Sequence, residues 1–185
     1  MTYTSSDISS KVVNRNPSGP FTTSTLQQTA SSRLGFGASR TMQIAQKLYQ
    51  GIEIEGETIG LITYMRTDGT NLSKDAISSF RDYIKNEIGN EYLPENSLNY
   101  SGKKAKNAQE AHEAIRPTDI VRTPQSVKKY LSPDQNRLYQ LIWSRSLSSQ
   151  MESAKFDRST VTIVSNDNDT ICKTSGSVLK FDGFL

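Results

Sequence analysis

Residues 51–73, GIEIEGETIGLITYMRTDGTNLS, carry the pattern that decides the local fold. Ile52 and Ile54 alternate with acidic residues ahead of the turn-forming pair Glu55–Gly56, and a second apolar run follows. Alternation on both sides of a short turn is typical of a β-hairpin. The pattern therefore predicts a hairpin whose second strand runs to Arg66 and is closed by the Asp-Gly turn that follows.

Tyr64 and Arg66 lie two residues apart on this predicted strand, and that spacing puts both side chains on one face. A tyrosine has a reference pKa of about 10, so it is a weak nucleophile at neutral pH. A nearby cation favours the phenolate, and a guanidinium can hold two phosphate oxygens in a forked hydrogen bond. The pair suits phosphoryl transfer to tyrosine, but most such pairs on strands are structural. The spacing alone therefore leaves both interpretations open.

Two short helices are predicted ahead of the hairpin. Ser24 can cap the first helix, with Gln27 completing a capping box and Gly35 ending the helix. Ser39 can cap the second helix, which carries apolar residues at helical spacing as far as Tyr49. Two helices joined by a glycine-bearing turn form a helix-turn-helix-like unit.

Three more helices are predicted after the hairpin. One begins after Ser73, and a short one runs through AQEAHEAI, residues 108–115, until Pro117 stops it. The clearest helix start is SPDQ, where Ser132 is the cap, Pro133 is the first helical residue and the glutamine completes a capping box.

The only histidine, His112, falls in the short helix, and Arg116 lies four residues further on. On a helix these two side chains share a face, an arrangement that suits a phosphate better than it suits mutual stability. A lone histidine is more often an ordinary surface residue than a functional one. The pair is therefore a candidate phosphate contact, and the alternative is that both are ordinary surface residues.

The two ends of the chain differ in character from its middle. Residues 1–20 are rich in Ser, Thr, Asn and Pro and predict an extended arm. After residue 155, RSTVTIVS and TICKTS read as two strands joined by an NDND turn. The apolar ending KFDGFL suggests a piece of a longer protein.

Composition sets broad limits on function. The chain has 185 residues, 34% of them hydrophobic, a mean hydropathy of -0.58 and a net charge of +3. Such a mild basic excess permits a nucleic-acid partner without arguing for one. The single cysteine, Cys172, excludes an internal disulfide and a cysteine-cluster zinc site. No apolar run is long enough to span a membrane, and no targeting pattern opens the sequence, so a cytoplasmic location is expected.

Three blocks of the sequence carry a family resemblance: PFTTSTLQQTASSRLGFGASRTMQIAQKLY, GLITYMRTD followed by NLS, and AQEAHEAIRPTD. In this order and at this spacing they resemble the signature blocks of bacterial type IA DNA topoisomerase I. The likeness extends over about residues 17–185. One departure is Gly69, where the family's pattern usually has serine.

The resemblance implies a mechanism and a division into domains. Tyr64 would attack a DNA phosphodiester, Arg66 would bind the scissile phosphate, His112 would help to position it, and Arg116 would contact DNA. Single-stranded DNA would be cleaved and rejoined without ATP through a 5′-phosphotyrosine, which relaxes negative supercoils. The fold implied is α+β and mostly helical, with a winged-helix-like tyrosine domain inserted in a partial strand-rich arch. That tyrosine domain would take residues 21–151, and the arch pieces would be residues 1–20 and 152–185.

The same resemblance implies what this chain would lack. The family's magnesium-binding acidic domain, with a lysine that assists the leaving oxygen, has no counterpart in these residues. No metal site is therefore expected here, and the chain alone is expected to be inactive without the remaining domains of its polypeptide. A monomer is expected.

Two other interpretations remain open. A winged helix-turn-helix module could bind duplex DNA without catalysis, but the second predicted helix then offers only Arg40 and Gln43 near its start for reading bases. Such a module would also be expected to carry a stronger basic face than a net charge of +3 supplies. A structural domain with no site of its own is the third interpretation.

Overall fold

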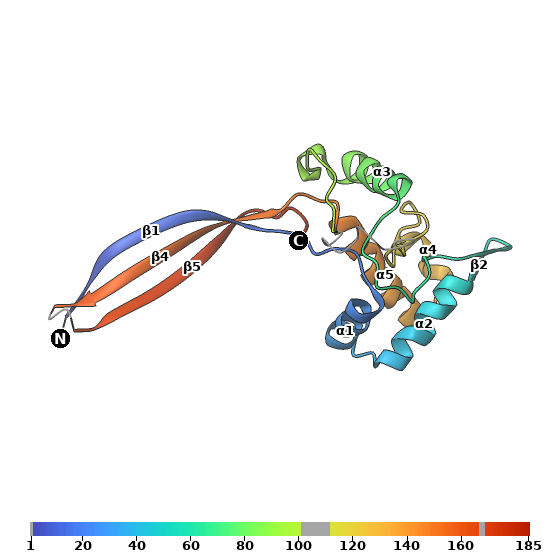
Figure 1. Ribbon diagram of the computed structural model, residues 1–185, viewed down its shortest axis with the longest axis horizontal. Helices are drawn as coiled ribbons and strands as arrows, with labels where there is room; N and C mark the ends of the chain where they lie inside the picture. Colours follow the sequence, from blue (N-terminus) through green and yellow to red (C-terminus); the bar gives the residue numbers. More distant parts are fainter. Residues whose placement is uncertain (1, 101–111, 167–168) are drawn as a thin grey trace. The chain divides into compact units, whose positions relative to one another are not determined.

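The computed structural model describes residues 2–100, 112–166 and 169–185. The chain divides into two compact units. Residues 1–17 and 152–185 form the strand unit, and residues 18–151 form the helical unit (Figure 1). The mixed α+β class expected from the sequence is confirmed.

The strand unit is one antiparallel sheet in the order β1-β4-β5. Its strands are β1 (Tyr3–Arg15), β4 (Ala154–Ser165) and β5 (Ile171–Phe181). The predicted hairpin of the last two strands is confirmed, although residues 167 and 168 of its turn lie outside the described residues. The predicted extended arm is a full strand, because its amides and carbonyls pair with β4 along nearly its whole length.

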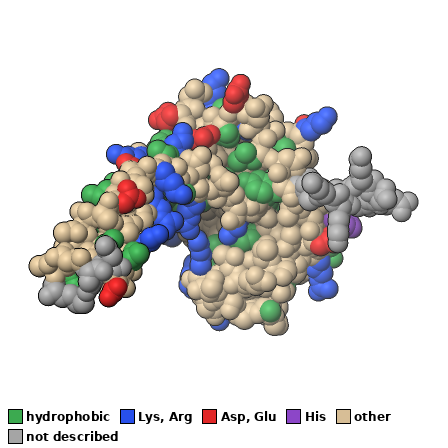
Figure 2. All heavy atoms as spheres, turned by 60° about the vertical axis from the view of Figure 1, so that its left-hand side comes forward, with side chains coloured by type: hydrophobic (Ala, Val, Ile, Leu, Met, Phe, Trp, Pro, Cys, Tyr) green, Lys and Arg blue, Asp and Glu red, His purple; other side chains and the backbone are tan. Residues whose placement is uncertain are grey.

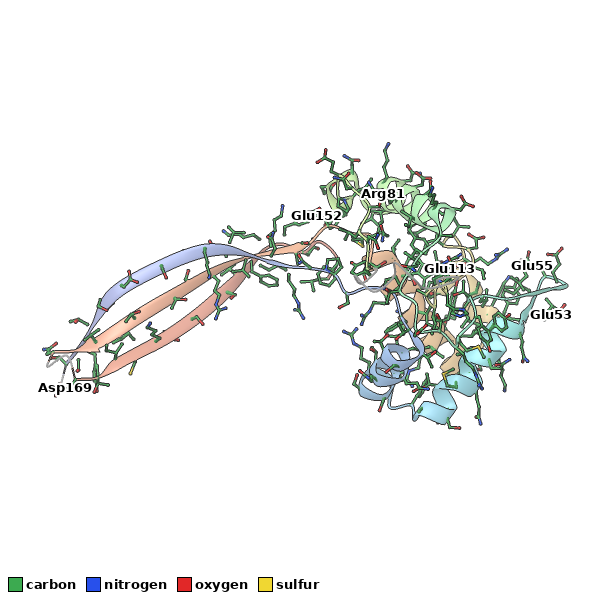
Figure 3. The ribbon with its side chains drawn as sticks, viewed as in Figure 1. Glu53, Glu55, Arg81, Glu113, Glu152 and Asp169 are labelled. Carbon is green, nitrogen blue, oxygen red and sulfur yellow. The ribbon has the colours of Figure 1, made fainter. Side chains whose placement is uncertain are left out.

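The helical unit contains helices and one small hairpin. Their bounds are α1 (Thr23–Leu34), α2 (Ala38–Gln50), β2 (Ile52–Ile54), β3 (Glu57–Ile59), α3 (Lys74–Tyr83), α4 (Pro124–Val127) and α5 (Pro133–Ser148). A π turn (Ile84–Ile88) extends α3, and short 3₁₀ turns lie at Asn90–Tyr92 and Lys128–Tyr130. Glu53 and Glu55 lie toward the free end of the β2–β3 hairpin (Figure 3).

The hydrophobic core of the helical unit gathers side chains from α1, α2, α5 and the segment after β3. Its largest fully buried members include Phe21, Leu26, Leu48, Leu61, Ile62, Met65, Ile115, Leu138, Tyr139 and Ile142. Tyr139 of α5 donates its hydroxyl proton to the carbonyl of Arg122 at 2.7 Å, and burial raises the pKa of that hydroxyl. The segments around residues 61–65 and 115 are therefore anchored by side chains that are buried in this core.

Two of the predicted helix caps are confirmed, and two others lie at different residues. The caps at Ser73 and Ser132 are confirmed, the latter with its full capping box. The cap of α1 is Thr22, paired with Thr25, and the predicted box of Ser24 and Gln27 is wrong. Thr22 has extended backbone angles and directly follows the buried Phe21, so the helix begins two residues earlier than the pattern suggested. Helix α2 likewise begins after Gly37, not after Ser39.

Two further expectations are corrected. Strand β3 ends at Ile59, so Tyr64 and Arg66 do not lie on a regular strand. The described part of the predicted helix at 108–115 is extended and makes isolated β-bridges, and the remainder lies outside the described residues. In both segments the backbone bonds to distant parts of the chain in place of a regular local ladder.

Candidate active site

Tyr64 and Arg66 lie on an irregular segment that nevertheless alternates inward and outward. Met65 is 2% exposed and belongs to the core, whereas Tyr64 is 49% exposed. Arg66 is exposed as well. Burial of Met65 between them therefore presents the phenol and the guanidinium to solvent, which is the outcome that the strand was expected to give.

The ring of Tyr64 contacts an aromatic ring of α2. It meets the ring of Tyr49, on α2, edge to face with centroids 5.3 Å apart. Tyr49 is itself 39% exposed. The edge-to-face contact restricts the orientation of the Tyr64 ring, and about half of the residue remains exposed.

Thr23, the first residue of α1, fastens the helix start to the segment that carries Arg66. Its hydroxyl lies 2.8 Å from the carbonyl oxygen of Met65 and accepts a hydrogen bond from the Thr67 amide at 2.8 Å. Its own amide donates to the carbonyl of Thr67 at 2.9 Å. Arg66 is thus held between two residues whose backbones are tied to one threonine.

Residues 112–116 form the third segment of the site. The amide of Thr63 donates to the carbonyl of Arg116 at 2.9 Å, and its hydroxyl donates to the carbonyl of Ala114 at 2.7 Å. The amide of Ile115 donates to the carbonyl of Phe21 at 2.8 Å. Residues 112–116 therefore lie against both the Tyr64 segment and the start of α1, and this brings His112 to the site.

These segments surround an open cavity of about 560 Å³. Its lining residues are Thr22, Thr23, Ser24, Gln27, Arg66, Thr67, Asp68 and His112. The cavity joins Arg66 and His112, two of the predicted site residues. Tyr64 and Arg116 are not among its lining residues.

The imidazole of His112 lies at the surface (purple in Figure 2). Among the described residues, no carboxylate lies within ion-pair distance of Arg66. The cavity also contains the Asp68 carboxylate, but Asp68 makes no ion pair with Arg66. An exposed guanidinium that is not paired to a carboxylate, beside an imidazole and hydroxyls, is suited to hold an anion such as a phosphate.

Arg116 has a different environment from the one predicted. Its Nε donates to Glu113 Oε1 at 2.8 Å and its Nη1 donates to the carbonyl of Pro117 at 2.9 Å. Because the segment is not helical, the expected face shared by His112 and Arg116 is wrong. Arg116 instead holds Glu113, whose carboxylate also accepts the Ser73 amide at 3.0 Å. Burial raises the pKa of Glu113, but the hydrogen bonds from Arg116 and Ser73 outweigh burial and lower the pKa below its ordinary value.

Gly69 packs against His112. A Cβ added at Gly69 would overlap the carbonyl oxygen of His112. The backbone of Gly69 is not left-handed, so this close approach, not φ, is what excludes a side chain. Just beyond, the amide of Ala114 donates to the carbonyl of Asn71 at 2.9 Å, which keeps the two segments in register.

Several cavity residues were not predicted to be functional from the sequence. Thr22, Thr23 and Asp68 lie within the family-like blocks without a predicted role, and Ser24 and Gln27 were assigned to a cap. The sequence signal that was available is the run of hydroxyl residues in PFTTST, several of which could cap the helix. Thr22 and Thr25 make the capping box, and Ser24 and Gln27 line the cavity.

The described residues offer no fit for a metal ion. No group of three or more His, Cys, Asp or Glu side chains could hold a metal within residues 2–100, 112–166 and 169–185. The same residues include no helix long and apolar enough to cross a membrane.

The sequence as a whole matches a family model described as DNA topoisomerase over residues 2–185. The chain belongs to this family, among the bacterial type IA DNA topoisomerase I proteins.

Curated relatives show how much of such a protein the chain represents. It is 52% identical to DNA topoisomerase 1 of Rickettsia typhi over 177 residues, which cover 96% of this chain and 23% of that protein. The Haemophilus influenzae DNA topoisomerase 1 is 49% identical over 182 residues, with 98% and 20% covered. The chain thus spans between a fifth and a quarter of the length of these relatives.

A solved structure supports the fold. Full-length topoisomerase I from Thermotoga maritima superposes with a TM-score of 0.86 at 39% sequence identity, covering 98% of this chain and 29% of that one.

Proposed function

We propose that this chain supplies the nucleophile and the phosphate-binding residues for cleavage and rejoining of single-stranded DNA. The observation that carries the proposal is the exposed Tyr64 two residues from Arg66, which lines one cavity together with His112. Membership of the DNA topoisomerase family supports DNA as the substrate.

In the proposed step the hydroxyl oxygen of Tyr64 attacks the phosphorus of a phosphodiester. The new bond joins Tyr64 to the 5′-phosphate, the bond from phosphorus to the 3′ oxygen breaks, and a 3′-hydroxyl leaves. The proton lost by Tyr64 is balanced by the one that the leaving oxygen gains. Because the phosphodiester energy is kept in the phosphotyrosine, the reverse attack rejoins the strand without ATP, and negative supercoils relax in between.

Arg66 contributes charge at the point where negative charge develops. A guanidinium donates two parallel hydrogen bonds to phosphate oxygens, and such preorganised donors are worth a hundredfold or more in rate. His112 lies on the same cavity and donates a further hydrogen bond to the phosphate or its neighbour. Arg116 donates to Glu113 and does not line this cavity, so the proposed step assigns it no direct role.

The helical unit then corresponds to the tyrosine domain and the strand unit to pieces of the arch. Magnesium and the lysine that assists the leaving oxygen belong to further domains of the full polypeptide in the bacterial cytoplasm. The non-catalytic winged-helix alternative is disfavoured by Arg40, one of the two residues that it offers for reading bases. Arg40 makes an ion pair with Asp134 of α5 and lies 5.1 Å from the ring centroid of Phe36.

The test uses a chimaera in which this chain replaces the matching 177 residues of the Rickettsia typhi DNA topoisomerase 1. With single-stranded DNA labelled at its 3′ end, the chimaera should become covalently labelled, and Tyr64→Phe should abolish the label. Tyr49→Phe is the matched control, because Tyr49 is the exposed ring in contact with Tyr64. Labelling that survives Tyr64→Phe would overturn the proposal.

A further inference from the structure

The sheet of the strand unit has two chemically different faces. Residues that pair directly across antiparallel strands share a face, and alternate residues along a strand change face. One face carries most of the exposed apolar side chains, among them Ile8, Val12 and Val178. The other, which we call the basic face, includes the directly opposed pair Lys11 and Arg158.

The basic face holds four exposed cations and one acid. The cations are Lys11, Arg15, Arg158 and Lys173, and the acid is Asp7. The apolar face carries Lys155 and Lys180, and there Asp157 pairs with Lys180 at 4.0 Å and accepts the Ser10 hydroxyl at 2.6 Å. Among the described residues, none of the four cations of the basic face takes part in an ion pair.

The pairing of Lys11 with Arg158 is unfavourable for the sheet by itself. Like charges directly opposite each other destabilise an antiparallel pair. Arg158 reaches the hydroxyl of Ser175 at 3.4 Å, which does nothing to neutralise the charge. A repulsive pair without a neighbouring carboxylate indicates a surface suited to an anion.

The cations form rows along the face. Arg15, then Lys11 with Arg158, then Lys173 follow one another at intervals of four residues in the strand register. At about 3.3 Å per residue the rows are about 13 Å apart and extend over about 26 Å. Hydroxyls of Ser9, Thr160 and Ser175 lie between the Lys11/Arg158 row and the Lys173 row, and Ser177 lies beside Arg158. The apolar side chains of Val13, Phe156 and Leu179 lie between the Arg15 row and the Lys11/Arg158 row.

We propose that this basic face binds the sugar–phosphate backbone of DNA, at a place distinct from the Tyr64 cavity. Extended rows of Lys and Arg interleaved with Ser and Thr hydroxyls are the groups that contact phosphates without reading sequence. A compact acidic protein patch would use one or two rows, whereas a polyphosphate engages all three. The choice of DNA among polyanions rests on the proposed function. Figure 2 shows basic and hydrophobic side chains on the surface of the strand unit.

The test measures binding of this chain to fluorescent oligonucleotides by anisotropy over a series of salt concentrations. The double variant Lys11→Thr/Arg158→Thr should weaken binding at least tenfold at low salt. It should also reduce the slope of log K against log salt by about 1.4 for single-stranded DNA or about 1.8 for duplex DNA, the values for two lost phosphate contacts. The DNA form whose reduction reaches its own value for two lost contacts identifies which backbone lies on the face.

The matched control is Lys155→Thr/Lys180→Thr, which removes the same charge from the opposite face. Equal losses in the two double variants would overturn the proposal, because net charge alone would then explain binding. A gain-of-function variant guards against misfolding: Asp7→Asn, on the basic face, should tighten binding, whereas Asp157→Asn should not. Absence of tightening in the folded Asp7→Asn variant would also contradict the proposal.

The outcome is separable from that of the proposed cleavage. Binding to the basic face requires no reaction, so Tyr64→Phe should leave the salt slope unchanged. If cleavage fails while the salt slope behaves as expected, the proposed function is wrong and the basic face stands. If cleavage occurs while the salt slope does not respond to the basic-face variants, the basic face is wrong and the proposed function stands.

Discussion

The Cα of Gly69 lies against the carbonyl oxygen of His112, with no room for a side chain between them. Gly69 follows Arg66 by three residues, and both Arg66 and His112 line the same cavity. The contact therefore sets the distance between the segment that carries Arg66 and the segment that carries His112. It also gives a structural reason for glycine where the family pattern usually has serine.

Gly69→Ala should push the His112 backbone away and slow DNA cleavage by the chimaera by about tenfold to a hundredfold, the effect of a displacement near 1 Å. Gly37→Ala is the control, since a Cβ there meets nothing within 4 Å. If Gly69 acts through His112, the loss should nearly vanish when His112→Ala is already present. Fully additive losses would assign Gly69 a general structural role instead.

Arg66→Ala should reduce the rate of covalent adduct formation by about a hundredfold to a thousandfold, as expected for loss of a preorganised donor. Arg66→Lys should recover part of the rate, because the charge returns without the forked geometry. The measurement is single-turnover cleavage of a labelled strand by the chimaera. Arg40→Ala, which removes a cation bound to Asp134, is the comparison, and an equal effect there would refute a specific role for Arg66.

Thr23→Val should destabilise the chain by about 1–3 kcal/mol, because it leaves the Thr67 amide and the Met65 carbonyl without the Thr23 hydroxyl. Valine keeps the shape of threonine, so packing changes little. Thermal or denaturant unfolding of the chain measures the effect. Ser32→Ala, an exposed hydroxyl on the same helix, should stay within about 0.5 kcal/mol, and a similar loss there would remove the special role of Thr23.

Glu113 makes stability depend on pH in a defined direction. Its pKa is lower in the folded chain than in the unfolded chain, where it is near 4.5. The carboxylate therefore stabilises the fold fully above the unfolded pKa, and this contribution is lost as the pH falls through the lowered folded pKa. Unfolding free energies measured from pH 7 downward should fall less steeply below about pH 5 for Glu113→Gln than for the unchanged chain. Parallel curves would show that the Arg116 and Ser73 contacts do not stabilise the carboxylate.

Local signals in the sequence predicted local structure well. Ser132 and Gln135 cap α5 as expected because every partner of that capping box lies within four residues. The cap of α1 was misplaced because several hydroxyls compete in PFTTST, and the choice is made by bonds from Thr23 to residues 65–67 far along the chain.

The sequence indicated which residues to consider for the site, but it did not predict the backbone structure that positions them. Tyr64 and Arg66 face solvent as the two-residue spacing required, but through burial of Met65 and not through a strand. The environment of His112 could not be derived, since its segment is held by contacts with Gly69, Asn71 and Phe21. The two faces of the β1-β4-β5 sheet could not be predicted either, because they depend on the register between β1 and β4.

The most direct test of Tyr64 as the nucleophile is to locate the DNA adduct within the trapped chimaera by mass spectrometry. Trypsin releases residues 48–66 between Lys47 and Arg66, and this peptide holds both Tyr49 and Tyr64. Fragmentation should place the nucleotide mass on Tyr64, as a 5′-phosphodiester of the tyrosine hydroxyl. A nucleotide on Tyr49, or on any residue outside this peptide, would contradict the assignment of Tyr64 as the nucleophile.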